Sequence, residues 1–115
     1  MSARTEVTVR AHLAAFLEQR GVPALLADYH EDAQLYSEER VYRGKREIGE
    51  FFTAFLESLP AGAIERFRLR SLHVHDELAY ITWSSAKHIP LGTDTFLVRD
   101  GRIASQTVAM YRGGG

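Results

Sequence analysis

Hydrophobic residues in the first half of the chain recur mainly with helical spacing. The pattern predicts an amphipathic helix over residues 5–20, with His12 on the buried stripe formed by Val9, Leu13, Phe16 and Leu17. Pro23 is typical of the first turn of a second, short helix, whose inner residues would include Tyr29. The clearest pattern predicts a helix over residues 45–59, with six apolar positions on one face: Ile48, Phe51, Phe52, Phe55, Leu56 and Leu59.

Alternation of polar and apolar residues indicates strands in the rest of the chain. A short strand is expected over residues 33–37, with Ser37 on the same face as Leu35, and a brief one near residues 41–42. After Pro60, four strands are expected one after another, over residues 63–75, 79–89, 91–99 and 102–111. The Asp100-Gly101 pair between the last two is a strong hairpin signal, so successive strands should pair antiparallel.

This order of elements favours an α+β fold in a single domain, residues 1–115. Three helices in the N-terminal half should pack on one side of a long, curved antiparallel sheet. A sheet that curls over helices can enclose a partly apolar hollow, and small ligands bind in such concave places.

Composition narrows the function classes. The formal charge of −1, from 14 basic and 15 acidic residues, gives no field of the kind that nucleic-acid binding needs, so no nucleic-acid partner is expected. The absence of cysteine excludes thiolate metal sites and cysteine nucleophiles and suits a reducing cytoplasm. The sequence contains neither a leader-like apolar segment at its start nor a run long enough to span a membrane. We therefore expect a cytoplasmic protein without a membrane partner.

Three segments carry a resemblance to a known superfamily: LLADYHEDAQLY, VYRGKREIGEFF and TDTFLVRDGRIASQTV. They resemble the nuclear-transport-factor-two-like superfamily, most closely its SnoaL-like members, which are related to polyketide cyclases and ketosteroid isomerase. The resemblance extends from Val9 to Tyr111. It implies a cone-shaped fold with a deep pocket and a homodimer formed through the outer face of the sheet. It implies no single activity, because this fold serves isomerases, cyclases, dehydratases and non-catalytic modules.

The residues of the isomerase transfer only in part. Its general base corresponds to Ser37, which cannot shuttle a proton as a carboxylate does, and its helical tyrosine falls near Leu13. Its second carboxyl, which is kept neutral so that it can donate a hydrogen bond, corresponds to Asp94. The resemblance thus implies a single acidic residue in the pocket.

Strand alternation singles out Asp94 independently of any family. It places Asp94 on one face with Phe96 and Val98, while Arg99 marks the opposite face as the outer one. Burial of a carboxyl group on an apolar face disfavours its charged form and makes it a candidate for acid or base chemistry. The alternative, that Asp94 only stabilises the sheet through hydrogen bonds, stays open.

Two further residues are candidates beside Asp94. The resemblance places Gln106, on the next strand, on the interior face, where it should be an amide neighbour of Asp94. His12, on the buried stripe of the first helix, could act as a base toward the same ligand. We name Asp94, His12 and Gln106 as the catalytic candidates. Thr82 and Ser84 should add a small polar cluster inside the cup. The expected ligand-binding residues are Leu13, Phe16, Tyr29, Ser37, Phe52, Phe55, Thr82, Ser84, Phe96, Val108 and Met110.

The sequence gives weaker signals for a metal site and for a dimer interface. His73 and His75 have a spacing compatible with metal ligation, but no third ligand is evident near them, so no metal and no cofactor are expected. Tyr36 and Trp83 fall on the strand faces taken as outer, where they would contribute to a dimer interface. Two function classes remain. One is an acid/base isomerase, cyclase or dehydratase for a small apolar compound with a carbonyl or hydroxyl group, and the other is a non-catalytic dimeric module that binds a ligand or a partner.

Overall fold

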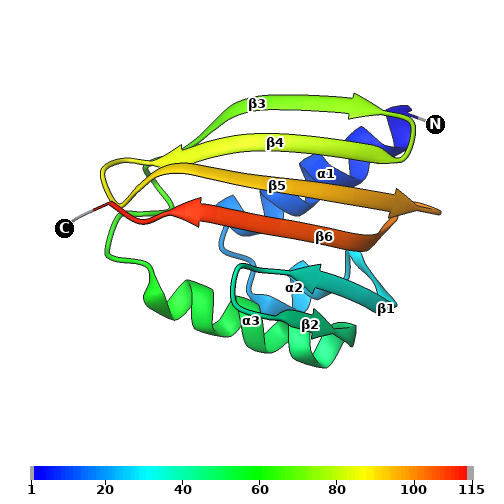
Figure 1. Ribbon diagram of the computed structural model, residues 1–115, viewed down its shortest axis with the longest axis horizontal. Coiled ribbons are helices and arrows are strands. Elements are labelled where there is room, and N and C mark those ends of the chain that lie inside the picture. Colours follow the sequence, from blue (N-terminus) through cyan, green and yellow to red (C-terminus); the bar gives the residue numbers. More distant parts are fainter. Residues whose placement is uncertain (1, 114–115) are drawn as a thin grey trace.

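The computed structural model describes residues 2–113. Three helices and six strands follow one another along these residues (Figure 1): α1 (Ser2–Leu17), α2 (Val22–Leu26), β1 (Tyr29–Tyr36), β2 (Val41–Arg43), α3 (Gly44–Ser58), β3 (Phe67–His75), β4 (Leu78–Ser85), β5 (Ile89–Arg99) and β6 (Arg102–Tyr111). The expected α+β class is confirmed. The third helix lies between β2 and β3, so strands both precede and follow it.

The strands form one six-stranded sheet in the order β2-β1-β6-β5-β4-β3. The expected antiparallel meander is present from β3 to β6, and Asp100 and Gly101, with positive φ values of 54° and 77°, make its last hairpin turn. The prediction of a wholly antiparallel sheet is wrong at one ladder, because β1 pairs with β6 in parallel, with Leu35 opposite Gln106. The sheet is therefore mixed.

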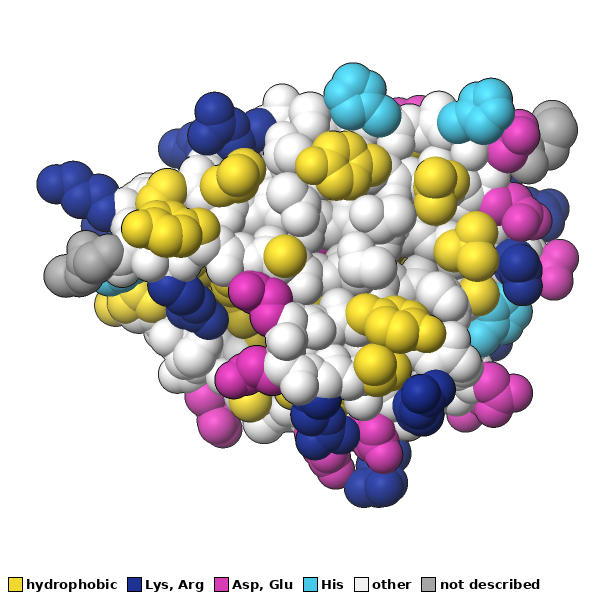
Figure 2. Space-filling model, viewed as in Figure 1, with side chains coloured by type: hydrophobic (Ala, Val, Ile, Leu, Met, Phe, Trp, Pro, Cys, Tyr) yellow, Lys and Arg dark blue, Asp and Glu magenta, His cyan; other side chains and the backbone are white. Residues whose placement is uncertain are grey.

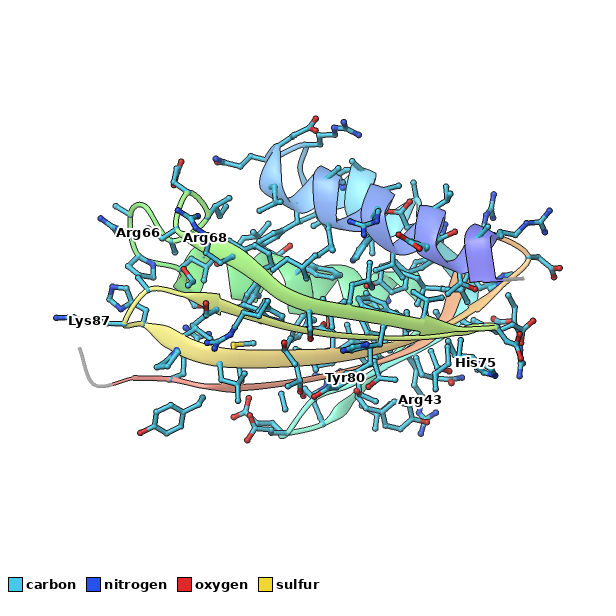
Figure 3. The ribbon with its side chains drawn as sticks, turned by 90° about the horizontal axis from the view of Figure 1, so that it is seen from above. Arg43, Arg66, Arg68, His75, Tyr80 and Lys87 are labelled. Atoms are coloured by element: carbon cyan, nitrogen blue, oxygen red, sulfur yellow. The ribbon has the colours of Figure 1, made fainter. Side chains whose placement is uncertain are left out.

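The helices cover only one face of this curved sheet. In Figure 1 the strands lie in front of α1, and the view from above in Figure 3 shows α1 on one side of the sheet and Tyr80 on the other. Apolar residues from both layers meet between them, since each amphipathic element buries its apolar face there. The buried core consists of Val9, Ala15, Leu25, Tyr29, Ala33, Leu35, Ile48, Phe52, Ala79, Ile81, Trp83, Ile89, Phe96, Val98, Ile103 and Val108.

Several boundaries differ from the sequence prediction, among them the start of β3, which begins at Phe67 where a strand was expected from residue 63. The second helix ends at Leu26, and Tyr29, expected on that helix, is the first residue of β1 and fully buried. Residues 30–32 continue the strand where a helix end was expected. Pro90, expected between two strands, lies within β5, and residues 86–88 make the connection instead. The chain pairs early at Tyr29 because β6 supplies a partner that the local pattern does not show.

The phase of β4 is opposite to the prediction. Ile81 and Trp83 face the core, whereas Thr82 and Ser84 face outward and are half-buried. Thr82 bonds to Ser71 on β3 through their hydroxyl oxygens, 2.6 Å apart. The expected polar cluster of Thr82 and Ser84 inside the cup is therefore wrong. The assignment of Trp83 to an outer interface is also wrong.

The outer face of the sheet carries apolar and neutral polar side chains. The exposed large hydrophobic residues of the strands on this face are Tyr36, Leu78, Tyr80, Leu91 and Tyr111. Figure 2, which views this face, shows hydrophobic side chains separated by neutral polar atoms, with most of the charged side chains toward the edges. Among residues 2–113, no helix has both the length and the hydrophobicity needed to cross a membrane.

Candidate functional site

A small apolar cavity lies between the sheet and the helices α1 and α3. Its volume is about 60 Å³, and side chains from both helices and four strands line it. Most of these side chains are aromatic or aliphatic. The lining consists of His12, Leu13, Phe16, Phe51, Phe52, Phe55, Phe67, Ile81, Trp83, Asp94, Phe96, Gln106, Val108 and Met110.

Among residues 2–113, Asp94 supplies the only carboxyl group in this lining. Its place in β5, with Ile81 opposite on β4 and Val108 opposite on β6, directs its side chain to the concave face, and 8% of the residue is exposed. The Trp83 indole Nε1–H donates a hydrogen bond to Oδ1 at 2.7 Å. The Gln106 amide Nε2–H donates one to Oδ2, also at 2.7 Å. Each carboxyl oxygen therefore has one neutral donor, and no basic side chain forms a salt bridge with Asp94 among the described residues.

Burial dominates the electrostatics of this carboxyl group. It raises the pKa of Asp94 from the usual 3.8 to about 6, although the hydrogen bonds from Trp83 and Gln106 and the nearby His12 act in the opposite direction. A carboxyl group whose pKa lies this close to neutral pH can both accept and donate a proton under physiological conditions. The geometry thus supplies an acid/base group on the wall of an apolar hollow.

Trp83 reaches Asp94 because the adjacent strand leaves room for the indole. Gly92, opposite Trp83 on β5, lies under the ring, and a Cβ atom at this position would come within 2.3 Å of the indole Cε2. On its other side the indole stacks on Phe67, with ring centroids 5.3 Å apart. Gly92 and Phe67 together hold the indole in the plane from which its N–H points at Asp94.

The hydrogen bonds continue from Asp94 through Gln106, Tyr29 and His12 to Asp28. The Tyr29 hydroxyl donates to the Gln106 amide oxygen, and the same hydroxyl oxygen lies 3.2 Å from Nε2 of His12. The other ring nitrogen of His12, Nδ1, lies 3.0 Å from Oδ2 of Asp28. The side chain of Asp28 is 23% exposed, whereas that of His12 is 6% exposed. One chain of side chains therefore links the cavity wall to the protein surface.

The Tyr29 hydroxyl group stays protonated in this series of hydrogen-bonded side chains. Burial raises its pKa well above the usual 10, and the negative charges of Asp94 and Asp28 raise it further. The Tyr29 hydroxyl is therefore a fixed donor and acceptor at neutral pH.

The structure brings most of the sequence-predicted residues to the cavity. Those in the lining are Asp94, His12, Gln106, Leu13, Phe16, Phe52, Phe55, Phe96, Val108 and Met110. Tyr29 lies behind the wall and contacts it through Gln106. Ser37 lies at the end of β1, where its hydroxyl bonds to the carbonyl oxygen of Arg40, and Thr82 and Ser84 are on the opposite face of the sheet.

Sequence reasoning missed five residues of the site. Trp83 was placed on the wrong face, and Phe51, Phe67, Ile81 and Asp28 were not singled out as site residues. The helical repeat that marks Phe52 and Phe55 also contains Phe51, so this residue could have been found. Asp28 carries no such signal, because it lies in the turn before β1 and meets His12 only after the sheet has formed.

A wider groove adjoins the cavity and shares Phe51, Phe55, Val108 and Met110 with it. Its volume is about 390 Å³, and it adds polar groups, among them Ser37, Glu38, Glu39, Ser58 and Arg112. Within residues 2–113, no group of three or more histidine or acidic side chains is placed to hold a metal ion. His73 and His75 lie at the far end of β3 and take no part in either hollow.

A mixed, curved sheet with helices on one face and a hollow between the layers defines the nuclear-transport-factor-two-like architecture. The chain belongs to the SnoaL-like domain family, whose model matches residues 9–106.

Solved structures with the same fold are distant in sequence. An NTF-2-like protein of unknown function from Burkholderia xenovorans is similar at 15% identity, with a TM-score of 0.76 over 98% of this chain and 87% of that one. A putative polyketide cyclase from Sinorhizobium meliloti is 19% identical, with a TM-score of 0.70 over 88% and 92% of the two chains. TerC, co-crystallised with polyporic acid, is 15% identical, with a TM-score of 0.70 over 94% and 92%. No curated protein matches the chain.

Proposed function

We propose that this protein binds a small, largely apolar organic molecule with a carbonyl or hydroxyl group and acts on it by acid/base chemistry. Asp94 is the group that accepts or donates the proton, and Gln106 and His12 support it. The reaction is an isomerisation, cyclisation or dehydration that passes through an enol-like state, and the residues present require no cofactor for it. The polyketide-cyclase neighbour and the neighbour crystallised with polyporic acid support this substrate class.

The observation that carries the proposal is the setting of Asp94. Its carboxyl group belongs to the lining of an otherwise apolar cavity and is buried, with its pKa raised to about 6. A carboxylate there can take a proton from a carbon next to a carbonyl group, which leaves an enolate and a neutral acid. The same acid can return the proton to another carbon or give it to a departing hydroxyl group.

The size of the cavity restricts how a substrate can bind. Ligand pockets typically have volumes of about 300–1,000 Å³, whereas the cavity beside Asp94 has about 60 Å³ and the adjoining groove about 390 Å³. A substrate would therefore insert one narrow apolar end beside Asp94 and lay the remainder along the groove. Its polar substituents would face Ser37, Glu38 and Arg112 there.

A ligand screen followed by one substitution tests this function. Steroid-like, polyketide-like and terpenoid compounds are tested for an increase in melting temperature, and each hit is then followed for chemical conversion by mass spectrometry. Asp94→Asn should abolish conversion while the circular dichroism spectrum stays native. Asp100→Asn is the matched control, since it makes the same change at an exposed turn at the end of β5, and it should retain full activity. Equal conversion by Asp94→Asn and wild type would contradict the proposal.

The alternative is a non-catalytic dimeric module that sequesters a ligand or binds a partner. Two observations favour it: the small cavity, and an outer sheet face where Leu78, Tyr80 and Leu91 are between 41% and 50% exposed. In this second proposal the outer faces of two copies pair and the cavity only stores a ligand. Compounds that raise the melting temperature equally in wild type and Asp94→Asn, without any conversion, would favour the module over the enzyme.

A further inference from the structure

The hydrogen bonds behind Asp94 have a direction that can be worked out from one end to the other. An ionised Asp94 can only accept, so the Gln106 amide must present its nitrogen to Asp94 and its oxygen to Tyr29. The Tyr29 hydroxyl has one hydrogen, which it donates to that amide oxygen. Its oxygen is then left with acceptor capacity alone toward the next group in the chain.

His12 is the point where this direction requires a charge. Its Nε2 faces the Tyr29 oxygen, which can only accept, so Nε2 must carry a hydrogen. Its Nδ1 faces the Asp28 carboxylate, another acceptor, so Nδ1 must carry a hydrogen as well. A histidine that donates from both ring nitrogens is the imidazolium cation. While Asp94 is ionised, all of these hydrogen bonds are therefore satisfied only when a positive His12 lies between the two carboxylates.

We propose that Asp28 is a positioning residue for Asp94: it holds His12 as an imidazolium and thereby fixes Tyr29 and the Gln106 amide in the orientation that keeps Asp94 ionised and ready to accept a proton. Asp28 does not touch the cavity. It acts through three intervening side chains and is itself partly exposed at the surface. The role of Asp28 in catalysis rests on the proposed function, but the charge states of His12 and Asp94 do not.

The surroundings of His12 support this reading. The titratable groups that interact with it are Asp28, Tyr29 and Asp94. The remaining neighbours are uncharged: Phe52 and Phe96 meet its ring edge-on or nearly so, with centroids 5.8 and 6.1 Å away. A buried cation needs a charged partner, and Asp28 is the group that forms an ion pair with it.

These side chains have a second complete arrangement, in which each bond from position 94 to Nε2 of His12 is reversed and the bond from Nδ1 of His12 to Asp28 keeps its direction. If the group at position 94 donates to Gln106, the amide turns over and its nitrogen faces Tyr29. The Tyr29 hydrogen is then free to bond to Nε2 of His12, and His12 needs only one hydrogen, on Nδ1. A neutral donor at position 94 should therefore remove the charge from His12 at the other end of the chain.

Nitrogen NMR of the histidine rings tests this directly, with the His12 signals assigned by their loss in His12→Asn. At neutral pH both ring nitrogens of His12 in the wild-type protein should show imidazolium shifts. In Asp94→Asn, whose amide can donate to Gln106, His12 should change to the neutral form protonated on Nδ1. A neutral His12 in wild type would overturn the proposal, and so would an unchanged imidazolium in Asp94→Asn.

A second pair of variants tests the role of Asp28. Asp28→Asn should remove the charge from His12 and raise the pKa of Asp94, followed through its carboxyl carbon shift. Asp32→Asn is the matched control on β1, because its side chain is exposed and far less enclosed, and it should change neither signal. In a Tyr29→Phe background the effect of Asp28→Asn on Asp94 should fall by half or more. An equal effect in both backgrounds would overturn the proposal that the hydrogen-bonded side chains transmit the effect. It would mean that Asp28 acts on Asp94 only through long-range electrostatics.

The outcomes separate this proposal from the proposed function. Catalysis that depends on Asp94 while His12 is neutral would remove the role of Asp28 and leave the function standing. If the predicted NMR changes occur but no compound is converted, the charge states of the hydrogen-bonded side chains stand and the proposed function fails.

Discussion

The two faces of β4 and β5 differ sharply although alternate residues of the same two strands form them. On the concave face, Trp83 and Asp94 are buried and hydrogen-bonded to each other, and Gly92 leaves the space that the indole occupies. On the convex face, Tyr80 is 41% exposed and lies opposite Thr95. A change on the concave face therefore disturbs several fixed partners, whereas a change on the convex face meets mainly solvent or a second molecule.

The largest expected effect concerns the pH dependence of stability on the concave face. The pKa of Asp94 is raised to about 6 from 3.8, so the folded state binds the proton more tightly than the unfolded state. This contribution to stability is fully present below about pH 4 and is lost as the pH rises through about 6. The loss is on the order of 3 kcal/mol, at about 1.4 kcal/mol for each pH unit. Urea unfolding of wild type and Asp94→Asn between these pH values measures it. A constant difference between the two proteins would contradict the prediction.

Matched aromatic substitutions on β4 compare the faces directly. Trp83→Phe removes the hydrogen bond to a buried carboxyl oxygen and should lower the free energy of unfolding by about 2–3 kcal/mol. Tyr80→Phe makes a similar small change on the convex face and should stay within about 0.5 kcal/mol of wild type. Chemical denaturation checks both values. Equal costs would show that the two faces do not differ in the way proposed.

A methyl group at Gly92 should cost about 1–3 kcal/mol, because it would overlap the indole of Trp83 and push it away from Asp94. The same Gly92→Ala change in a Trp83→Leu background should cost less than half as much, since the overlapping ring is gone. The measurement is a double-mutant cycle of unfolding free energies. Additive costs would mean that contact with Trp83 is not what makes glycine necessary.

A substitution on the convex face should have the smallest effect on the stability of one subunit. It should instead change whether two subunits assemble. If two copies pair through this face, Leu91→Glu should convert a dimer to a monomer in light scattering while the unfolding free energy of the subunit changes little. Val7→Glu is the control, because Val7 is 67% exposed on α1 and away from this face. A monomeric wild-type protein at micromolar concentration would contradict the assembly.

These comparisons also show what the sequence can and cannot predict. The inward side of β5 was predicted correctly because Asp94, Phe96 and Val98 alternate with residues up to Arg99, whose charge marks the outer face. The inward side of β6 was predicted from the family resemblance. In β4 both faces contain apolar residues, so alternation alone does not decide whether Trp83 or Tyr80 faces the core. The register against β5, where Trp83 meets Gly92, decides it.

Contacts between distant segments could not be predicted from the sequence for a related reason. The parallel pairing of β1 with β6 joins segments far apart in the chain, and no local pattern names the partner of a strand. Because that pairing fixes Tyr29 against Gln106, the hydrogen-bond chain to Asp28 could not be foreseen. The helices, which depend on local periodicity, were predicted to within a few residues for α1 and α3.

The most direct measurement of the central claim is a carbon NMR titration of the Asp94 carboxyl group, assigned by its loss in Asp94→Asn. The structure predicts a midpoint at about pH 6, because burial outweighs the bonds from Trp83 and Gln106. It also predicts that a ligand seated in the cavity shifts this midpoint, while the midpoints of exposed carboxyl groups stay in place. A midpoint at about pH 4, unmoved by any bound ligand, would contradict the assignment of Asp94 as the acid/base group of this protein.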